Sequence, residues 1–527
     1  MKSAKAEELP GSHKPCAVRN RSTLVHALAF GATAVLLLFR LYDHLPGLAD
    51  RAQFTGYTPL GPLPPNINSS VCVQWPPLHP VKHGQLDREL NLYYTSRDFQ
   101  LLSFMRLGGA VRIPPSTIIA LLEKTRWDTF GELHEFLQEE FPIVYQALNV
   151  TKVNKYGLVF HWQGSSSAKP YILAAHQDVV PVEPLTADQW KHAPFSGFYD
   201  GTWIWGRGSC DDKSNLISQL IAIEALLKTG FRPTRTLVLA FGFDEEAKGT
   251  EGAGSIASYL EDTYGLDSFA LILDEGGGQV KDGNVIFATP SISEKGYLDV
   301  KMEVTTPGGH SSIPPEHTSI GLLSRLVIAI EDNPHKPRLT RTGTPFAATQ
   351  CLATYSPSFP DDVRALAKKA MSDTSALEQL QDALLRLSPV YKAMLGTTQA
   401  VDLIEGGVKV NALPEHAAAV VNHRIAEDSS VTELQRRLID VVSPVVIKYN
   451  MTLEAFEREV VSGDAGRVTL SDAYGTSLEP SPTTPTEYGP WAVLAGSIKA
   501  TFESSPTYNS SGVVVAPSLS IGKIVSP

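Results

Sequence analysis

The chain has 527 residues, of which 43% are hydrophobic and 19% charged, as in ordinary globular proteins. At about 150 residues per domain, this length suggests three or four units, or two larger ones, and it is enough to bury a hydrophobic core. The formal net charge is −11, and because an acidic chain repels phosphate backbones, we expect no nucleic-acid partner. Four cysteines without a CxxC pair exclude a cysteine-rich zinc module and a dense disulfide scaffold.

The amino-terminal region predicts a membrane anchor. Residues 23–39 read TLVHALAFGATAVLLLF, a run without formal charge that is just long enough to cross a bilayer. Basic residues outnumber acidic ones before it, which places the amino terminus in the cytosol and the bulk of the chain on the lumenal side. We therefore expect a single-pass type II protein with a cytosolic tail (1–22), a transmembrane signal anchor (23–42) and a Pro-rich stalk (43–88). A cleaved signal peptide is the alternative.

Two other features of the sequence are compatible with a secretory route. N-x-S/T triplets, the acceptors of N-linked glycans, follow the anchor at Asn68, Asn149, Asn450 and Asn509. In an oxidising compartment, Cys72, Cys210 and Cys351 leave room for one disulfide within the chain, and the sequence does not specify which pair forms it.

Strand and helix patterns alternate in residues 89–296. The apolar runs YILAAH (171–176), TLVLAFGF (236–243) and FALILDE (269–275) predict strands, and residues 214–230 predict a helix between the first two. This alternation is typical of an α/β fold with a mainly parallel central sheet. We therefore expect the first part of the larger domain here, and the family resemblance described below implies that this is the catalytic domain.

The pattern changes after residue 296. YLDVKMEVTT alternates apolar and polar residues like a half-exposed antiparallel strand, HAAAVVNHRI predicts another strand, and residues 321–332 and 361–395 predict helices. We expect an inserted, smaller α+β domain at 297–460, which the family resemblance described below implies is a lid or dimerisation domain. The second, incomplete part of the catalytic domain then follows at 461–527.

Four segments place acidic residues or histidine after the predicted strands or in the turn before the predicted helix. They are AAHQDVVPV with His176 and Asp178, WGRGSCDDKSNL with Asp211 and Asp212, FGFDEEAKGTEGAGS with Asp244, Glu245 and Glu246, and LILDEGGG with Asp274 and Glu275. Taken alone, the acids of each segment can be explained as helix caps or as residues at helix starts, where negative charge is favourable. Acids gathered at one sheet edge repel one another, however, and a divalent cation would neutralise them. Imidazole and carboxylates without thiolates favour zinc, and the number of acids favours two ions.

Five segments, HQDVVPV, GRGSCDDKSN, DEEAKGTEGA, LDEGGG and PGGHSS, resemble those of the M20 family of metallopeptidases in order and spacing. Within this family the sequence is most similar to the fungal vacuolar Gly-Xaa carboxypeptidases, which also begin with a cytosolic tail and one anchor. The resemblance covers nearly the whole chain.

The resemblance implies a set of zinc ligands. His176 would bind one zinc, with Asp178 orienting its ring, and Asp274 would complete that site. Asp211 would bridge the two zinc ions. Glu246 would bind the second ion.

The resemblance also implies residues that act on the substrate. Glu245 would be the general base. His310 in PGGHSS would stabilise the oxyanion. In dimeric relatives this histidine comes from the partner subunit, so the resemblance also implies a homodimer as a partner state. Asn411 in VNALPE and Arg424 in NHRI would hold polar groups of the substrate, with its free carboxylate the candidate for Arg424.

The carboxyl terminus departs from the family. Relatives continue after VVVAPSL with an N-T-D-(T/S)-(R/K) segment and later supply a histidine that binds the second zinc beside Glu246. This sequence reads VVVAPSLSIGKIVSP to Pro527, and its last histidine is His423. We expect an incomplete gene sequence rather than a genuine but impaired protein, because the other catalytic positions are present. Protein of this length is then expected to be poorly active or unstable.

The implied function is that of a zinc-dependent carboxypeptidase of the vacuole, which hydrolyses small peptides of the Gly-Xaa type with metal-activated water. One alternative is an amidohydrolase or synthase of the same family that acts on N-acyl amino acids, and another is a catalytically impaired, membrane-tethered homologue. A serine hydrolase is disfavoured because no GxSxG motif occurs, and the HEFLQ segment at 134–138 lacks the second histidine of a zincin.

Overall fold

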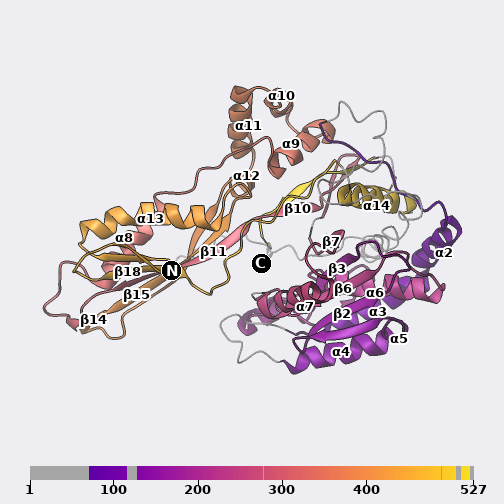
Figure 1. The fold of residues 1–527 in the computed structure, drawn as a ribbon, viewed down its shortest axis with the longest axis horizontal. Helices are drawn as coiled ribbons and strands as arrows, with labels where there is room; N and C mark the ends of the chain where they lie inside the picture. Colours follow the sequence, from indigo (N-terminus) through magenta and orange to yellow (C-terminus); the bar gives the residue numbers. More distant parts are fainter. Residues whose placement is uncertain are drawn as a thin grey trace, which may run out of the picture.

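The computed structural model describes residues 71–115, 127–247, 249–276, 278–487, 489–505, 508 and 512–522. The predicted cytosolic tail, the signal anchor and most of the stalk lie outside these ranges. Among the helices within them, none is long and apolar enough to cross a membrane. Figure 1 shows two bodies side by side: a catalytic body that contains β3 (Tyr171–His176) and an elongated lid that contains β11 (Gly296–Thr305).

A five-stranded sheet forms the centre of the catalytic body, in the order β1-β2-β6-β3-β7. Its other strands are β1 (Asn149–Val153), β2 (Gly157–Trp162), β6 (Leu237–Gly242) and β7 (Leu271–Leu273). β3 runs parallel to β6 and β7, as the alternation of strands and helices predicts. β1 and β2 are antiparallel, because the short turn at 154–156 joins them and a parallel pair needs a longer crossover. β2 is also antiparallel to β6, so the sheet is mixed rather than mainly parallel.

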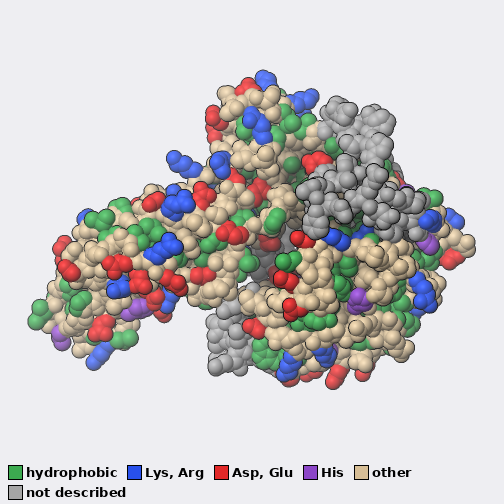
Figure 2. Space-filling model, viewed as in Figure 1, with side chains coloured by type: hydrophobic (Ala, Val, Ile, Leu, Met, Phe, Trp, Pro, Cys, Tyr) green, Lys and Arg blue, Asp and Glu red, His purple; other side chains and the backbone are tan. Residues whose placement is uncertain are grey.

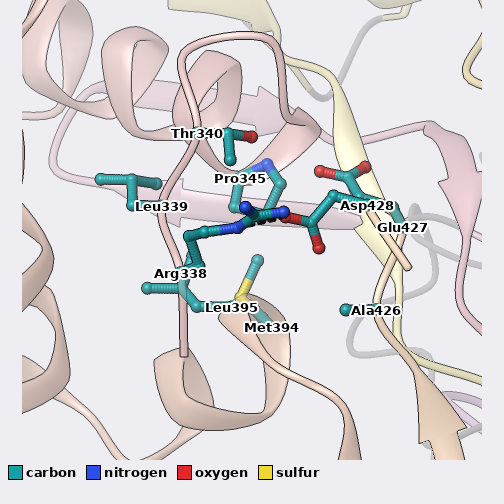
Figure 3. A pocket seen from close by; sticks show the side chains of 9 residues that line it. All are labelled: Arg338, Leu339, Thr340, Pro345, Met394, Leu395, Ala426, Glu427 and Asp428. Carbon is teal, nitrogen blue, oxygen red and sulfur yellow. Dashed lines mark hydrogen bonds and ion pairs between the residues drawn. The ribbon is translucent and has the colours of Figure 1, made fainter. Parts of the chain in front are cut away.

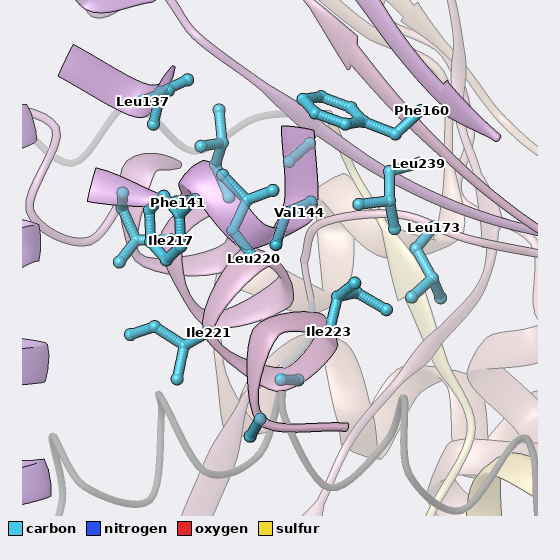
Figure 4. Packing of buried hydrophobic residues seen from close by; sticks show 14 of the residues in the cluster. Leu137, Phe141, Val144, Phe160, Leu173, Ile217, Leu220, Ile221, Ile223 and Leu239 are labelled. Carbon is cyan, nitrogen blue, oxygen red and sulfur yellow. The ribbon is translucent and has the colours of Figure 1, made fainter. Parts of the chain in front are cut away.

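Helices cover both faces of this sheet. One face packs against α3 (Arg97–Val111), α4 (Asp128–Glu140), α5 (Pro142–Ala147) and α6 (Lys213–Lys228), and the other packs against α7 (Ser255–Tyr264). α6 confirms the helix predicted at 214–230. Figure 4 shows Ile217, Leu220 and Ile223 of α6 among the side chains of the sheet and of the outer helices. A helix that is apolar on nearly all sides is stable only when it is covered in this way.

The lid is built on a six-stranded sheet in the order β13-β15-β11-β18-β16-β17. Its other strands are β13 (Thr398–Gly406), β15 (His416–Ile425), β18 (Arg467–Asp472), β16 (Thr452–Ala455) and β17 (Arg458–Val461). Alternate residues of β11 are buried under α8 (Ser319–Glu331) and α13 (Val431–Lys448), which confirms the predicted half-exposed antiparallel strand. β18 pairs with β11 although it lies beyond residue 460, so the lid extends further along the chain than the sequence pattern indicates.

A separate group of helices lies between α8 and β13 in the chain. It comprises α9 (Thr344–Tyr355), α10 (Asp361–Ala370), α11 (Thr374–Leu387) and α12 (Val390–Leu395), which share a small core. α10 to α12 confirm the helices predicted at 361–395. Figure 3 shows a small pocket at the joint between this group and the lid, where Nη2 of Arg338 lies 2.6 Å from Oδ2 of Asp428. None of the candidate site residues lines this pocket.

Residues 72–79, which we call the strap, pack on the outside of the catalytic body and on α9, although the sequence places them in the stalk. Cys72 forms a disulfide with Cys351 of α9, which is one of the pairings that the sequence left open. Gln74 exchanges two hydrogen bonds of 3.0 Å with the main chain of Val515. α2 (Gly84–Thr95) follows the strap and packs on α3.

The last part of the chain returns to the segment after β7, as the sequence predicts. α14 (Pro490–Ser504) packs on β19 (Val513–Val515). β19 runs parallel to β9 (Val285–Ala288), which pairs with β8 (Gln279–Asp282). β20 (Ser518–Ser520) runs parallel to β10 (Ser291–Glu294), the strand that leads from the catalytic body into β11 of the lid.

Candidate metal centre

The four acidic segments come together at the edge of the catalytic sheet where the parallel strands end, which is the usual place for a site in such a fold. The strand ends carry His176, Glu245, Glu246 and Glu275, and the turn before α6 carries Asp211 and Asp212. Figure 2 shows a hollow between the two bodies with acidic side chains along its rim.

His176 is the centre of this group. Its side chain is 3% exposed, and its Nε2 lies 3.1 Å from Oδ1 of Asp211 and 3.3 Å from Oε2 of Glu275. Oε2 of Glu245 lies 4.0 Å from the same nitrogen. Nδ1 lies 3.2 Å from Oδ1 of Asp178, so this carboxylate holds the ring with Nε2 toward the acids.

Asp178 also holds the loop that follows β6. Its two carboxylate oxygens accept hydrogen bonds from the main-chain N–H groups of Glu245 and Glu246, at 3.2 and 3.1 Å. The side chain is fully buried, and these donors together with His176 compensate for the loss of water around it. Asp178 therefore fixes the acids after β6 relative to the end of β3.

Two sets of side chains bring their possible ligand atoms within 4.8 Å of one another. The first is His176, Asp211 and Glu246, which are three of the four expected zinc ligands. The second is His176, Asp212 and Glu275. Both sets share His176, so one imidazole serves either arrangement.

Asp212 and Glu275 belong to the acidic segments found in the sequence but not to the zinc ligands that the resemblance implies, and the structure places both of them beside His176. The fourth expected ligand, Asp274, is exposed and belongs to neither set, and its Oδ1 accepts a hydrogen bond from the N–H of Glu275 at 2.9 Å. Each of the two additional residues is the second acid of an acidic pair, which is the only signal for it in the sequence. A pair of acids does not reveal which member faces the sheet edge, because this depends on the direction of the chain after the strand.

Asp244 is an acid of the segment after β6, but it holds the main chain at the start of a helix and does not face His176. Its carboxylate accepts hydrogen bonds from the N–H groups of Glu251 and Gly252, at 2.9 and 2.7 Å. It therefore ties down the turn that leads into α7, whereas Glu245 and Glu246 face His176 and its neighbours.

The electrostatics of the cluster favour an added positive charge. Burial acts to lower the pKa of His176, but the carboxylates of Asp178, Asp211 and Glu275 outweigh it and raise this pKa well above its ordinary value. Burial and the neighbouring acids raise the pKa of Asp212. One imidazole among carboxylates, without a thiolate in either set, is a donor set that fits zinc.

His310 and Asn411 lie at the far end of the lid. β12 (Gly309–His310) pairs with β14 (Ala412–Leu413), which directly follows Asn411. Both side chains are exposed, and Nδ1 of His310 lies 2.7 Å from Oγ of Ser312. Figure 1 shows β14 at the outer tip of the lid, away from β3, which lies inside the catalytic body. Within one chain, the structure therefore does not bring His310 and Asn411 to His176.

Arg424 lies on β15 near the junction with the catalytic body. Its guanidinium carbon is 5.6 Å from the centre of the Tyr297 ring. Burial raises the pKa of Glu294, with the positive charge of Arg424 opposing this shift and the negative charge of Glu275 adding to it. The charges of Arg424, Asp274 and Glu275 thus all act on Glu294, which ends β10, the strand that joins the two bodies.

The arrangement of the sheet edge, with one imidazole among carboxylates, is that of a metal-dependent hydrolase. Residues 172–484 match the family described as peptidase family M20/M25/M40. This match spans more than half of the chain, and the protein belongs to this family of metallopeptidases.

Relatives within the family include carboxypeptidases. The chain is 37% identical to carboxypeptidase S of Saccharomyces cerevisiae over 466 residues, which cover 86% of this chain and 80% of that protein. It is 34% identical to an N-fatty-acyl-amino acid synthase/hydrolase of Homo sapiens over 363 residues, which cover 68% and 69% of the two chains. Among solved structures, the fold is similar to that of the di-peptidase Dug1p from Saccharomyces cerevisiae, with a TM-score of 0.52 and 14% identity over 81% of this chain and 85% of that one.

Proposed function

We propose that this protein is a zinc-dependent carboxypeptidase that hydrolyses small peptides of the Gly-Xaa type. The observation that carries the proposal is the convergence of Asp211, Glu246 and Glu275 on the buried ring of His176. The 37% identity to carboxypeptidase S supports the choice of a carboxypeptidase over other members of the family.

Of the two zinc ions that the resemblance implies, one would be held by His176 and an acid of the turn after β7, the other by Glu246, and Asp211 would serve both. Of the two acids in that turn, Glu275 lies nearer to His176, and Asp274 is the one that the resemblance implies. When bound, zinc polarises the scissile carbonyl and lowers the pKa of water.

Glu245 is the proposed general base. Its side chain is 37% exposed, so water and substrate reach it, and its main-chain N–H is fixed by Asp178. It would accept the proton of the attacking water and return it to the departing amine.

The terminal carboxylate of the substrate would be bound by Arg424, because a guanidinium offers two parallel donors to a carboxylate. Tyr297 lies against this guanidinium and limits its movement. A neutral carboxamide at the same end of the peptide would lose this ion pair.

His310 and Asn411 would serve the site of a second copy in a homodimer. β13 is an edge strand of the lid sheet, so its outer backbone groups are available for pairing. Exposed apolar side chains gather beside it and beside β14, namely those of Ile313, Leu403, Ile404, Val408 and Val410. Such a surface favours contact with another copy of the chain.

The test of the proposed function is hydrolysis of Gly-Leu by purified full-length protein with and without Zn²⁺. We expect activity that a chelator removes and Zn²⁺ restores, and a loss of about 10² to 10⁴-fold in Glu245→Gln. Glu261→Gln, a change on the outer face of α7, is the matched control and should keep full activity. Hydrolysis that is indifferent to chelators, or unchanged in Glu245→Gln, would contradict the proposal.

An N-acyl-amino-acid hydrolase or synthase is the second candidate, supported by the 34% identity to the human enzyme of that kind. Both activities would use the same metal centre and differ in the group on the amine side of the scissile bond. Preferred hydrolysis of an N-oleoyl amino acid over Gly-Leu would favour it.

For the cellular location we propose the lumenal side of the vacuole membrane, reached through the secretory pathway. The Cys72–Cys351 disulfide supports this, since such bonds persist in oxidising compartments. Asn149 and Asn450 are both exposed, as acceptors of N-linked glycans must be. A mass shift on endoglycosidase treatment that becomes smaller in Asn149→Gln and in Asn450→Gln would support this placement, and the absence of any mass shift in the wild type would contradict it.

A further inference from the structure

The residue between the histidine and the aspartate of HQDVVPV is Gln177, which the proposed chemistry leaves unused. Its side chain is completely buried, and it makes its hydrogen bonds inside the catalytic body. Nε2 donates to the main-chain oxygens of Tyr156, Phe241 and Gly242, at 2.8, 2.9 and 3.1 Å. These three oxygens can only accept, so the amide must present its NH₂ group to them.

His134 of α4 completes the hydrogen bonding of this amide. With the NH₂ group used, Oε1 of Gln177 needs a donor, and Nε2 of His134 lies 2.8 Å from it. Burial lowers the pKa of His134 to about 4, so at neutral pH its ring is uncharged and carries the required proton on Nε2. His134 therefore fixes which way the amide of Gln177 faces.

The contacts of Gln177 join the two strands that carry the metal centre. Phe241 and Gly242 are the last residues of β6, and the acids Glu245 and Glu246 begin three residues after Gly242. The main-chain N–H of Gln177 also donates to the oxygen of Gly242, at 3.0 Å. The end of β6 is thus held through its carbonyl groups by Gln177, while the loop beyond it is held through its N–H groups by Asp178.

We propose that Gln177, oriented by His134, is a positioning residue that sets the spacing between His176 and the pair Glu245–Glu246. It acts only through these neighbours, since its own side chain faces the core. This inference rests on the proposed function, in which the same residues hold zinc and move the proton. A merely structural role, in which the amide only satisfies three buried oxygens, would change stability and leave the metal centre as it is.

The test compares Gln177→Leu with Gln350→Leu in the full-length protein. Gln350 is a second buried glutamine, whose Nε2 donates to the main-chain oxygen of Ala367 at 2.9 Å within the helical group, away from the metal centre. Zinc affinity is measured by competition with a chelator, kcat and KM on Gly-Leu at saturating Zn²⁺, and stability by thermal unfolding. Both variants should lose stability. Only Gln177→Leu should lose zinc affinity or kcat, by about 10- to 100-fold, with KM within about twofold.

A second pair of variants keeps the test decisive if Gln177→Leu does not fold. His134→Gln retains an N–H donor for Oε1 of Gln177, and His134→Phe removes it. We expect His134→Phe to lose zinc affinity or kcat and His134→Gln to recover most of the loss. Equal zinc affinity and equal kcat in both variants, or no difference between Gln177→Leu and Gln350→Leu, would overturn the inference.

Failure of the proposed function gives a different result. Wild-type protein that binds Zn²⁺ without hydrolysing Gly-Leu would contradict the proposed activity. The difference in zinc affinity between Gln177→Leu and Gln350→Leu would still support or overturn the positioning role, because it needs no turnover.

Discussion

The carboxyl edge of the catalytic sheet and the far end of the lid both carry expected site residues, but they are built in opposite ways. At the sheet edge, His176 and Asp178 are buried and are held by hydrogen bonds to neighbouring elements. At the end of the lid, His310 and Asn411 are exposed beside apolar side chains. One chain thus holds the candidate metal ligands in place, and it leaves the other expected site residues on an exposed surface of the lid.

The two regions should differ most in zinc binding, as measured in His176→Ala and His310→Ala. His176 belongs to both sets of possible ligands, so its removal should abolish zinc binding and all detectable hydrolysis of Gly-Leu. His310→Ala should keep its zinc and lose about 10² to 10³-fold in kcat, the usual effect of removing one oxyanion donor. Metal analysis after dialysis separates the two, and zinc retained by His176→Ala would contradict the assignment.

Mixing two inactive variants tests whether the regions meet between chains. A dimer of one His310→Ala chain and one Glu245→Gln chain contains one site with both residues intact. Random pairing of equal amounts should therefore restore about a quarter of the wild-type activity. A mixture no more active than its components would show that His310 does not serve another chain.

The disulfide between the strap and α9 can be removed without changing any residue of the two regions compared above. Cys72 and Cys351 are 279 residues apart, and closing so long a loop restricts the unfolded chain strongly. The double variant Cys72→Ala/Cys351→Ala should lose about 2 to 5 kcal/mol of stability in urea unfolding. Its zinc affinity should not change. A loss of zinc affinity would mean that the strap also shapes the metal centre.

A smaller effect is expected from His423, the buried counterpart of His310 within the lid. Burial lowers the pKa of His423 to about 4, below the value of about 6.5 in an unfolded chain. The unfolded state therefore binds the proton first, and this contribution to stability is lost as the pH falls from 6.5 toward 4. At pH 5 the loss is about 2 kcal/mol. The free energy of unfolding should differ less between pH 7.5 and pH 5 in His423→Gln than in the wild type. An equal difference in the two proteins would contradict the lowered pKa of His423.

The strands that carry the metal centre could be predicted from the sequence because their apolar runs end at polar residues. β3 matches the predicted run 171–176, and the ends of β6 and β7 bring their acids to the same edge as His176. Short apolar runs do not reveal their neighbours, so the antiparallel β1–β2 pair was missed. Its residues pair through a tight turn rather than through a crossover.

The remaining features depend on contacts between distant segments. The choice of Glu275 over Asp274 near His176 follows from the path of the chain after β7, which no local pattern specifies. The sequence predicts a stalk at the strap because its prolines exclude a helix or a central strand. Its disulfide and hydrogen-bonding partners, however, lie more than 270 residues further along the chain. Gln177 was passed over because an amide between two site residues has no chemistry of its own.

The strap also constrains the order in which the molecule can be completed during synthesis. Gln74 is made early, but its hydrogen-bonding partner Val515 is made 441 residues later. The hydrogen bonds of Gln74 therefore form only after the chain up to Val515 has been made, and until then a nascent chain exposes the surface that will receive this side chain. The strap can thus form its disulfide with α9 before it forms its hydrogen bonds with β19.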